Sequence, residues 1–185
     1  MAYTAIDDPS AYFKVQLYTG NGSANHAITF DDTDTDMEPD LVWIKNRDAT
    51  DAPCIFNSVR GATKLINPNT DAEEKTDADT LDSFTSDGFQ VDADVKVNTN
   101  AEKYVAWCWK ESTTSGLDIL TFTGDASGGT ISHGLSAVPE FIYCDNITAT
   151  SENTAIFHGS LGGTKYLNIG STAAVASDLG GYERW

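Results

Sequence analysis

The chain has 185 residues, which is enough for one or two domains with a buried core. Its 28 acidic residues outnumber its 11 basic residues and give a net charge of −17 at pH 7, which disfavours nucleic acids and anionic membranes as partners. The sequence contains neither an apolar run long enough to span a membrane nor an N-terminal secretory signal, so we expect synthesis in a cytoplasm without export.

Short apolar runs bounded by turn-forming residues occur along the whole chain and are typical of β-strands. Phe13, Val15 and Leu17 alternate with polar residues and would share one face of a strand. Residues 104–109 are apolar at every position, which predicts a central strand covered on both faces. Helix is expected only as a turn after Thr70. The predicted strands are residues 12–18, 27–30, 40–45, 54–57, 88–91, 104–110, 118–123, 130–133, 140–144, 154–158 and 166–169.

The second half of the chain repeats the first. Phe56 and Lys64 correspond to Phe157 and Lys165 at a constant offset of 101 residues (157 − 56 and 165 − 64). Two upstream blocks match at offsets of 104 and 100 (122 − 18 and 138 − 38): YTGN at 18–21 with FTGD at 122–125, and EPDLVWI at 38–44 with VPEFIYC at 138–144. A period near one hundred residues is that of a domain. The sequence therefore predicts an all-β fold of tandem antiparallel β-sandwich repeats.

The repeat divides the chain into four segments. They are an N-terminal arm (1–15), a first β domain (16–110), a polar linker (111–116) and a second β domain (117–185). At the offset of 101, Trp185 corresponds to Phe84, so the second copy lacks counterparts of two strands predicted in the first. An incomplete sandwich exposes an unpaired strand edge. We therefore expect the natural protein to continue past Trp185, with strands supplied by another chain as the alternative.

Three aspartates at alternating positions, Asp32, Asp34 and Asp36, form the densest acidic site. Their alternation would direct carboxylate oxygens to one point, as Ca²⁺ requires. The spacing excludes an EF-hand, because positions six and twelve counted from Asp32 hold Met37 and Trp43 in place of Gly and Glu. A calcium loop of another kind and a solvated hairpin tip both remain as interpretations.

The sequence contains no motif that predicts catalysis. It lacks the GxSxG and HExxH patterns, and its Gly-rich segments lack the lysine of a phosphate-binding loop. The cysteines lie in apolar runs without paired spacing, so we expect them to be buried. They are Cys54, Cys108 and Cys144. The chain has four tryptophans, Trp43, Trp107, Trp109 and Trp185. We expect most of them to pack in the core, with the floor of a sugar site as the alternative.

Several segments, in their order along the chain, resemble a family of repeat-containing virion proteins of tailed bacteriophages, known from marine and cyanobacterial phages. In the first copy they are MAYTAIDDPSAYF, YTGNG, EPDLVWIKNR, SVRGATK, SFTSDGF and VNTNAEKYVAWCWK. In the second copy they are FTGDASGGTISHGL, VPEFIYCDN and IFHGSLGGTKYL. The resemblance covers nearly the whole chain, and no catalytic residues and no cofactor come with it.

The resemblance implies a non-enzymatic structural protein of the virion, synthesised in the cytoplasm of the host. It favours the particle-proximal part of a tail fibre, a homotrimer that docks on other virion proteins while distal parts meet a glycan of the host surface. The residues expected to dock on the virion are Tyr3, Ile6, Tyr12 and Phe13. Two alternatives are a capsid decoration protein and the carbohydrate-binding module of a tailspike.

Overall fold

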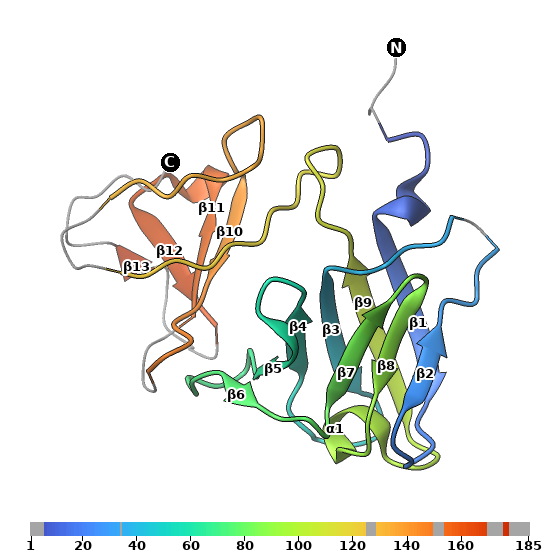
Figure 1. Ribbon diagram of the computed structural model, residues 1–185. Helices are drawn as coiled ribbons and strands as arrows, with labels where there is room; N and C mark the ends of the chain where they lie inside the picture. The colour runs from blue at the N-terminus through green and yellow to red at the C-terminus, as the bar shows by residue number, and fades with distance from the viewer. Residues whose placement is uncertain (1–5, 34, 125–128, 150–153, 170–175, 178–185) are drawn as a thin grey trace.

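The computed structural model describes residues 6–33, 35–124, 129–149, 154–169 and 176–177. Within these residues the fold is all-β, as the sequence predicts: the strands form three sheets in which every strand pair is antiparallel (Figure 1). The short helices are η1 (Pro9–Ala11), α1 (Val95–Asn98) and η2 (Gly159–Leu161). No helix among the described residues is long and apolar enough to cross a membrane.

The largest sheet has six strands in the order β1–β9–β3–β4–β5–β6. They are β1 (Phe13–Thr19), β9 (Lys103–Trp109), β3 (Leu41–Asn46), β4 (Cys54–Asn57), β5 (Gly61–Ile66) and β6 (Lys75–Thr76). The last strand in sequence, β9, lies between β1 and β3 and pairs with both along its length. β1 begins at Phe13, so the first sheet starts before the boundary expected at Gln16.

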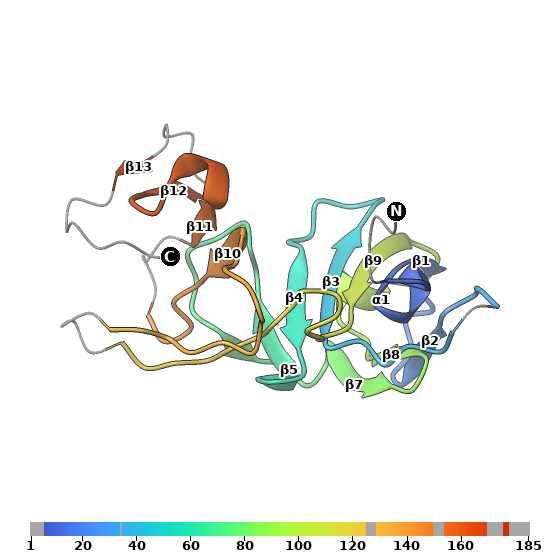
Figure 2. The ribbon, with the colours of Figure 1, turned by 90° about the horizontal axis from the view of Figure 1, so that it is seen from above.

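A three-stranded sheet in the order β2–β8–β7 packs on one side of the large sheet. Its strands are β2 (His26–Thr29), β8 (Gly88–Val91) and β7 (Leu81–Thr85). Figure 2 shows β7 and β8 as one layer and β3, β9 and β1 as the other. Tyr104, Phe56 and Phe89 are fully buried between them. Each buried aromatic side chain of this kind stabilises the fold by about 1.5–3 kcal/mol, so this core holds the first unit together.

The remaining strands form a second, smaller unit, in the order β10–β11–β12–β13. They are β10 (Phe141–Cys144), β11 (Ala155–His158), β12 (Lys165–Asn168) and β13 (Ala176–Ser177). The equivalent strand pairs are Val42–Phe56 and Ile142–Phe157, Ile55–Ile66 and Ile156–Leu167, and Lys64–Thr76 and Lys165–Ser177. The second sheet therefore reproduces the strand order and register of β3–β6 at the offsets of the sequence repeat.

The structure differs from the predicted elements in three respects. Residues 118–123 and 130–133 form no strand, although both were predicted to do so. The segment after Thr70 contains β6 in place of a helical turn, and the one α-helix among the described residues is α1. β5 and β7 were not predicted, because their polar residues hide the alternation.

Candidate functional site

The side of the large sheet that faces away from the core carries an apolar surface. Strand pairing places its side chains in cross-strand rows on β1, β9 and β3. The rows are Phe13–Trp109–Leu41, Val15–Trp107–Trp43 and Leu17–Val105–Lys45. We call the eight apolar members of these rows the aromatic face. Its position follows from the strand period of two, because the intervening residues of β9 and β3 are all buried in the core.

The aromatic face is open to solvent, most of all along β1. Phe13 and Val15 are exposed, and Leu17 is 56% exposed. The rings of Phe13 and Trp109 are 5.2 Å apart, and this contact half-covers the indole. Among the described residues, no strand or helix packs over β1 on this side (Figure 2). Contiguous exposed apolar side chains are a feature of interaction sites on protein surfaces.

Charge is nearly absent from this face, in contrast to the rest of the chain. Its three rows contain no carboxylate, although the protein carries a net charge of −17. Lys45 is their single charged member, and its Nζ donates to the carbonyl oxygen of Ala49 at 2.9 Å. A face without acidic groups approaches another surface without the repulsion that the remainder of the molecule would cause.

The structure corrects the expectation that the tryptophans pack in the core. Trp43, Trp107 and Trp109 lie on the aromatic face and are half-buried, and Trp185 lies outside the described residues. β9 is central in the sheet as predicted, but the described elements bury only its other face, where Tyr104 and Ala106 lie. The alternation of residues along a strand shows that the sheet has two faces, but it does not show which face the second sheet covers.

A small hollow lies beside Trp43. It is lined by Trp43, Pro53, Pro68, Asn69 and Ile169 and has a volume of about 180 Å³. Ile169 comes from the second unit, so the hollow is formed by both units. Its wall is largely apolar with one amide side chain, which suits a small ring stacked on the indole.

Asp32 takes part in an ion pair on the opposite side of β1. Its Oδ1 lies 2.6 Å from Nζ of Lys14, whose side chain is only 4% exposed. The same ammonium lies 5.2 Å from the centre of the Phe30 ring. Asp36 is exposed, and Asp34 lies outside the described residues. No cluster of three metal-ligating side chains occurs in the described part of the chain, and calcium binding stays a prediction.

The residues expected to dock on the virion fall in different places. Phe13 belongs to the aromatic face, where its ring contacts Trp109. Ile6 and Tyr12 are half-buried near the start of β1, and Tyr3 lies outside the described residues. Among the described members of this set, the structure thus joins Phe13 alone to the apolar surface. The remainder of that surface comes from β9 and β3, which the expectation did not include.

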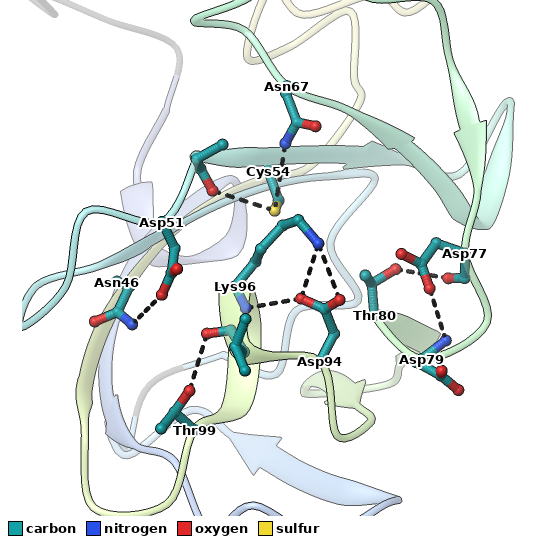
Figure 3. A network of polar contacts seen from close by, with 12 residues as sticks. Asn46, Asp51, Cys54, Asn67, Asp77, Asp79, Thr80, Asp94, Lys96 and Thr99 are labelled. Atoms are coloured by element: carbon teal, nitrogen blue, oxygen red, sulfur yellow. Dashed lines mark hydrogen bonds and ion pairs between the residues drawn. The ribbon is translucent and has the colours of Figure 1, made fainter.

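Cys54 belongs to a polar network beside α1 (Figure 3). Asp94 caps α1 by accepting a hydrogen bond from the Lys96 amide at 2.7 Å, and its carboxylate pairs with Lys96 Nζ at 2.9 Å. The Cys54 thiol donates to the carbonyl oxygen of Ala52 and accepts a long contact of 3.8 Å from Asn67. Burial raises the pKa of Cys54 to about 12. The thiol is therefore protonated at neutral pH and is not a nucleophile.

Contacts between the two units surround Arg60, at the turn between β4 and β5. Its guanidinium is buried and pairs with Glu74 at 2.7 Å. The Glu74 amide donates to the carbonyl oxygen of Ile147 in the second unit at 3.2 Å. Burial raises the pKa of Asp145, and the nearby positive charge of Arg60 partly offsets this shift. The Arg60 guanidinium, whose charge is balanced by the Glu74 carboxylate, thus lies where the first unit contacts the second.

Residues 8–183 match the model of a family described as a domain of unknown function, DUF7483. No curated protein and no solved structure matches the chain.

Proposed function

Because the chain belongs to the DUF7483 family, whose function is unknown, we propose its role from its surface: it is a structural protein that assembles through the aromatic face. We further propose that the assembly is a bacteriophage particle and that the protein is not an enzyme. The observation that carries the assembly role is the row of exposed side chains Phe13, Val15 and Leu17 beside Trp107 and Trp109.

The physical argument concerns the composition of this face. Trp and Phe are enriched in protein–protein interfaces, and charged residues are depleted at interface centres. The aromatic face has both properties, whereas the chain as a whole is strongly acidic. Leaving several large apolar side chains in water is unfavourable by about 25 cal/mol for each Å². A partner surface that covers them recovers this free energy.

The assignment to a virion is supported by the resemblance of the ordered sequence segments to repeat-containing phage proteins. Within the particle we propose the tail, with the protein forming the proximal part of a fibre. A homotrimer is the usual state of such fibres, and the aromatic face offers each subunit a surface to bury. Other virion proteins are the remaining partners, and distal parts would meet a glycan of the host.

Antibody–gold labelling of purified phage particles, seen by electron microscopy, tests this proposal. Gold at the tail is the expected result. Gold distributed over the head would replace the fibre role with that of a capsid decoration protein. Particles without gold, from a lysate that contains the soluble protein, would contradict a structural role in the virion.

The hollow beside Trp43 favours a second candidate function, carbohydrate binding. The Trp43 indole, two prolines and the Asn69 amide suit a pyranose ring, whose apolar side stacks on aromatic rings. Calorimetric titration with glycans of the host surface tests this. Saturable binding that is lost in Trp43→Ala and kept in Trp109→Ala would favour a binding module of a tailspike. Equal heats of glycan binding in the two variants would exclude the hollow as the glycan-binding site.

A further inference from the structure

The position of β8 and β9 in the first unit defines which strands depend on them. β9 pairs with β1 on one side and with β3 on the other. β8 pairs with β2 and with β7. By contrast, β3, β4, β5 and β6 pair with one another in sequence order, and of β8 and β9 only β9 pairs with them, at the β3 edge. The first unit therefore combines a four-stranded part with strands that β8 and β9 attach to it.

The second unit contains the equivalent of the four-stranded part. β10–β13 repeat the order and register of β3–β6, and β10 stands at the edge where β3 pairs with β9. In the described residues, β11 is the one strand that pairs with β10. The edge of β10 that corresponds to the β9 side of β3 therefore has no strand against it in this part of the chain.

The segments before β10 show the same pattern. Residues 117–123 match β1 at an offset of 104 (122 − 18), and residues 130–133 follow them as β2 follows β1. Both segments lack strand structure beyond a single bridge at Leu117 (Figure 1). Leu120, Phe122 and Ile131 are exposed, with Phe122 56% exposed.

Each unformed strand of the second unit is thus the counterpart of a strand that β8 or β9 holds in the first. The strands whose counterparts pair among themselves have all formed. Weak strand propensity does not explain the difference, because 118–123 has the alternating, β-branched sequence of a strand. A missing partner explains all three sites at once: the β10 edge, the segment 117–123 and the segment 130–133.

We propose that the second unit is a strand acceptor, which binds an extended polypeptide segment from outside these 185 residues. The segment lies antiparallel between residues 117–123 and β10, as β9 lies between β1 and β3. This proposal does not depend on the phage assignment. It predicts that binding orders residues 117–123 as a strand and covers Phe122.

The occupant has a definite chemistry. It is an extended segment of about seven residues, the length of β9, whose backbone pairs on both sides. Its alternate side chains are apolar and of mixed size, as Tyr104, Ala106 and Cys108 are on the core side of β9. A preceding strand of the β8 kind would pair with residues 130–133.

A second copy of this chain is a poor occupant. Its own β9 is already paired along both edges and buried on one face. Direct pairing of two β10 edges would leave residues 117–123 without the strand that β9 supplies to β1 in the first unit. The donor is therefore a segment without a sheet of its own.

An extended chain tests the proposal. Residues 85–110 of the first unit, which contain β8 and β9, are copied after Trp185 and serve as the probe segment. A matched control carries Tyr104→Pro and Ala106→Pro in the copied strand only, which removes two backbone donors. Hydrogen exchange of residues 117–123 and 140–144 is measured by mass spectrometry in both chains and in the original.

We expect exchange in both segments to slow by about tenfold or more with the intact extension and to stay unchanged with the control. Unchanged exchange with the intact extension, or equal slowing with the control, would overturn the proposal. The same segment added as a separate peptide to the original chain repeats the test if the extended chain misfolds. In the original chain, exchange at residues 140–144 could instead slow as the protein concentration rises, while a dimer mass is measured. That result would assign the β10 edge to a second copy of the chain and would also overturn the proposal.

Discussion

Trp43 and Trp107 lie opposite each other on β3 and β9, with ring centroids 6.2 Å apart and ring planes at 69°. This edge-to-face pair stands on the side of the sheet that faces away from the core, and Val15 extends its row onto β1. Aromatic pairs of this geometry contribute about 0.5–1.5 kcal/mol beyond the area that they bury. The pair lies at the centre of the aromatic face, the surface through which we propose that the protein assembles.

Two leucines distinguish the aromatic face from the core. Leu17 is 56% exposed on the face, and Leu65 is 1% exposed in the core. Leu65→Ala should lower the free energy of unfolding by about 2–5 kcal/mol, and Leu17→Ala by less than about 1 kcal/mol, because only the former leaves a cavity. Urea denaturation of the isolated chain measures both. Equal losses would show that Leu17 is covered in the free protein.

The buried Lys14 ammonium should depend on Asp32, its carboxylate partner, for its contribution to stability. Asp32→Ala leaves the Lys14 ammonium without that carboxylate in a site that is 4% exposed, and should cost about 2 kcal/mol. Lys14→Met keeps the volume and removes the charge, so its stability should stay within about 1 kcal/mol. A double-mutant cycle in thermal melts isolates the coupling. A loss from Asp32→Ala that persists in the Lys14→Met background would show that Asp32 acts elsewhere.

Stability should fall at high pH. Burial raises the pKa of Cys54 from 9.0 to about 12 and also raises the pKa of Cys108, so the unfolded chain loses these protons first. The stabilisation is therefore complete below pH 9 and is lost as the pH rises toward 12. At pH 10 each thiol should contribute about 1.4 kcal/mol less to the free energy of unfolding than it does at neutral pH. Urea midpoints at pH 8 and pH 10 test this, with Cys54→Ala as the variant that should show the smaller decrease.

Gly88 is a position where a side chain does not fit. Its φ is +133°, and a Cβ would lie 2.1 Å from the carbonyl oxygen of Ile28 on the neighbouring strand. Gly116 also has a positive φ, of +76°, but a Cβ there meets nothing within 4 Å. Gly116→Ala should cost about 1 kcal/mol, and Gly88→Ala at least about 3 kcal/mol with the β2–β8 pairing disturbed. Similar melting temperatures for the two variants would contradict this close approach.

The sequence predicts the strands of the central sheets well where apolar residues alternate. β4 and β8 have the predicted bounds, and β1, β3 and β9 differ by one residue at each end. The strands that were not predicted, such as β5 and β7, mix polar and apolar residues without a clean alternation and are fixed by their neighbours in the sheet. Residues 118–123 show the opposite case, since strand propensity there finds no partner among the described residues.

The candidate site was only partly accessible to sequence reasoning. Phe13 was identified, and the one-sided alternation of Val15 and Leu17 was visible. Whether that side meets the core or solvent depends on β8 packing on one face of the sheet and not on the other, which is a tertiary property. The buried Lys14 and Gln16 on the core side made the choice harder, because polar residues usually mark the solvent side.

Incorporation of surface variants into phage particles tests the assembly role most directly. Leu17→Asp places a charge on the aromatic face, and Val59→Asp places one at an exposed site on the turn after β4. Both variants should fold with unchanged melting temperatures. Immunoblots of purified particles, from a phage supplied with each variant in place of its own protein, should show Val59→Asp at normal amounts and Leu17→Asp absent. Equal incorporation of the two would contradict assembly through the aromatic face.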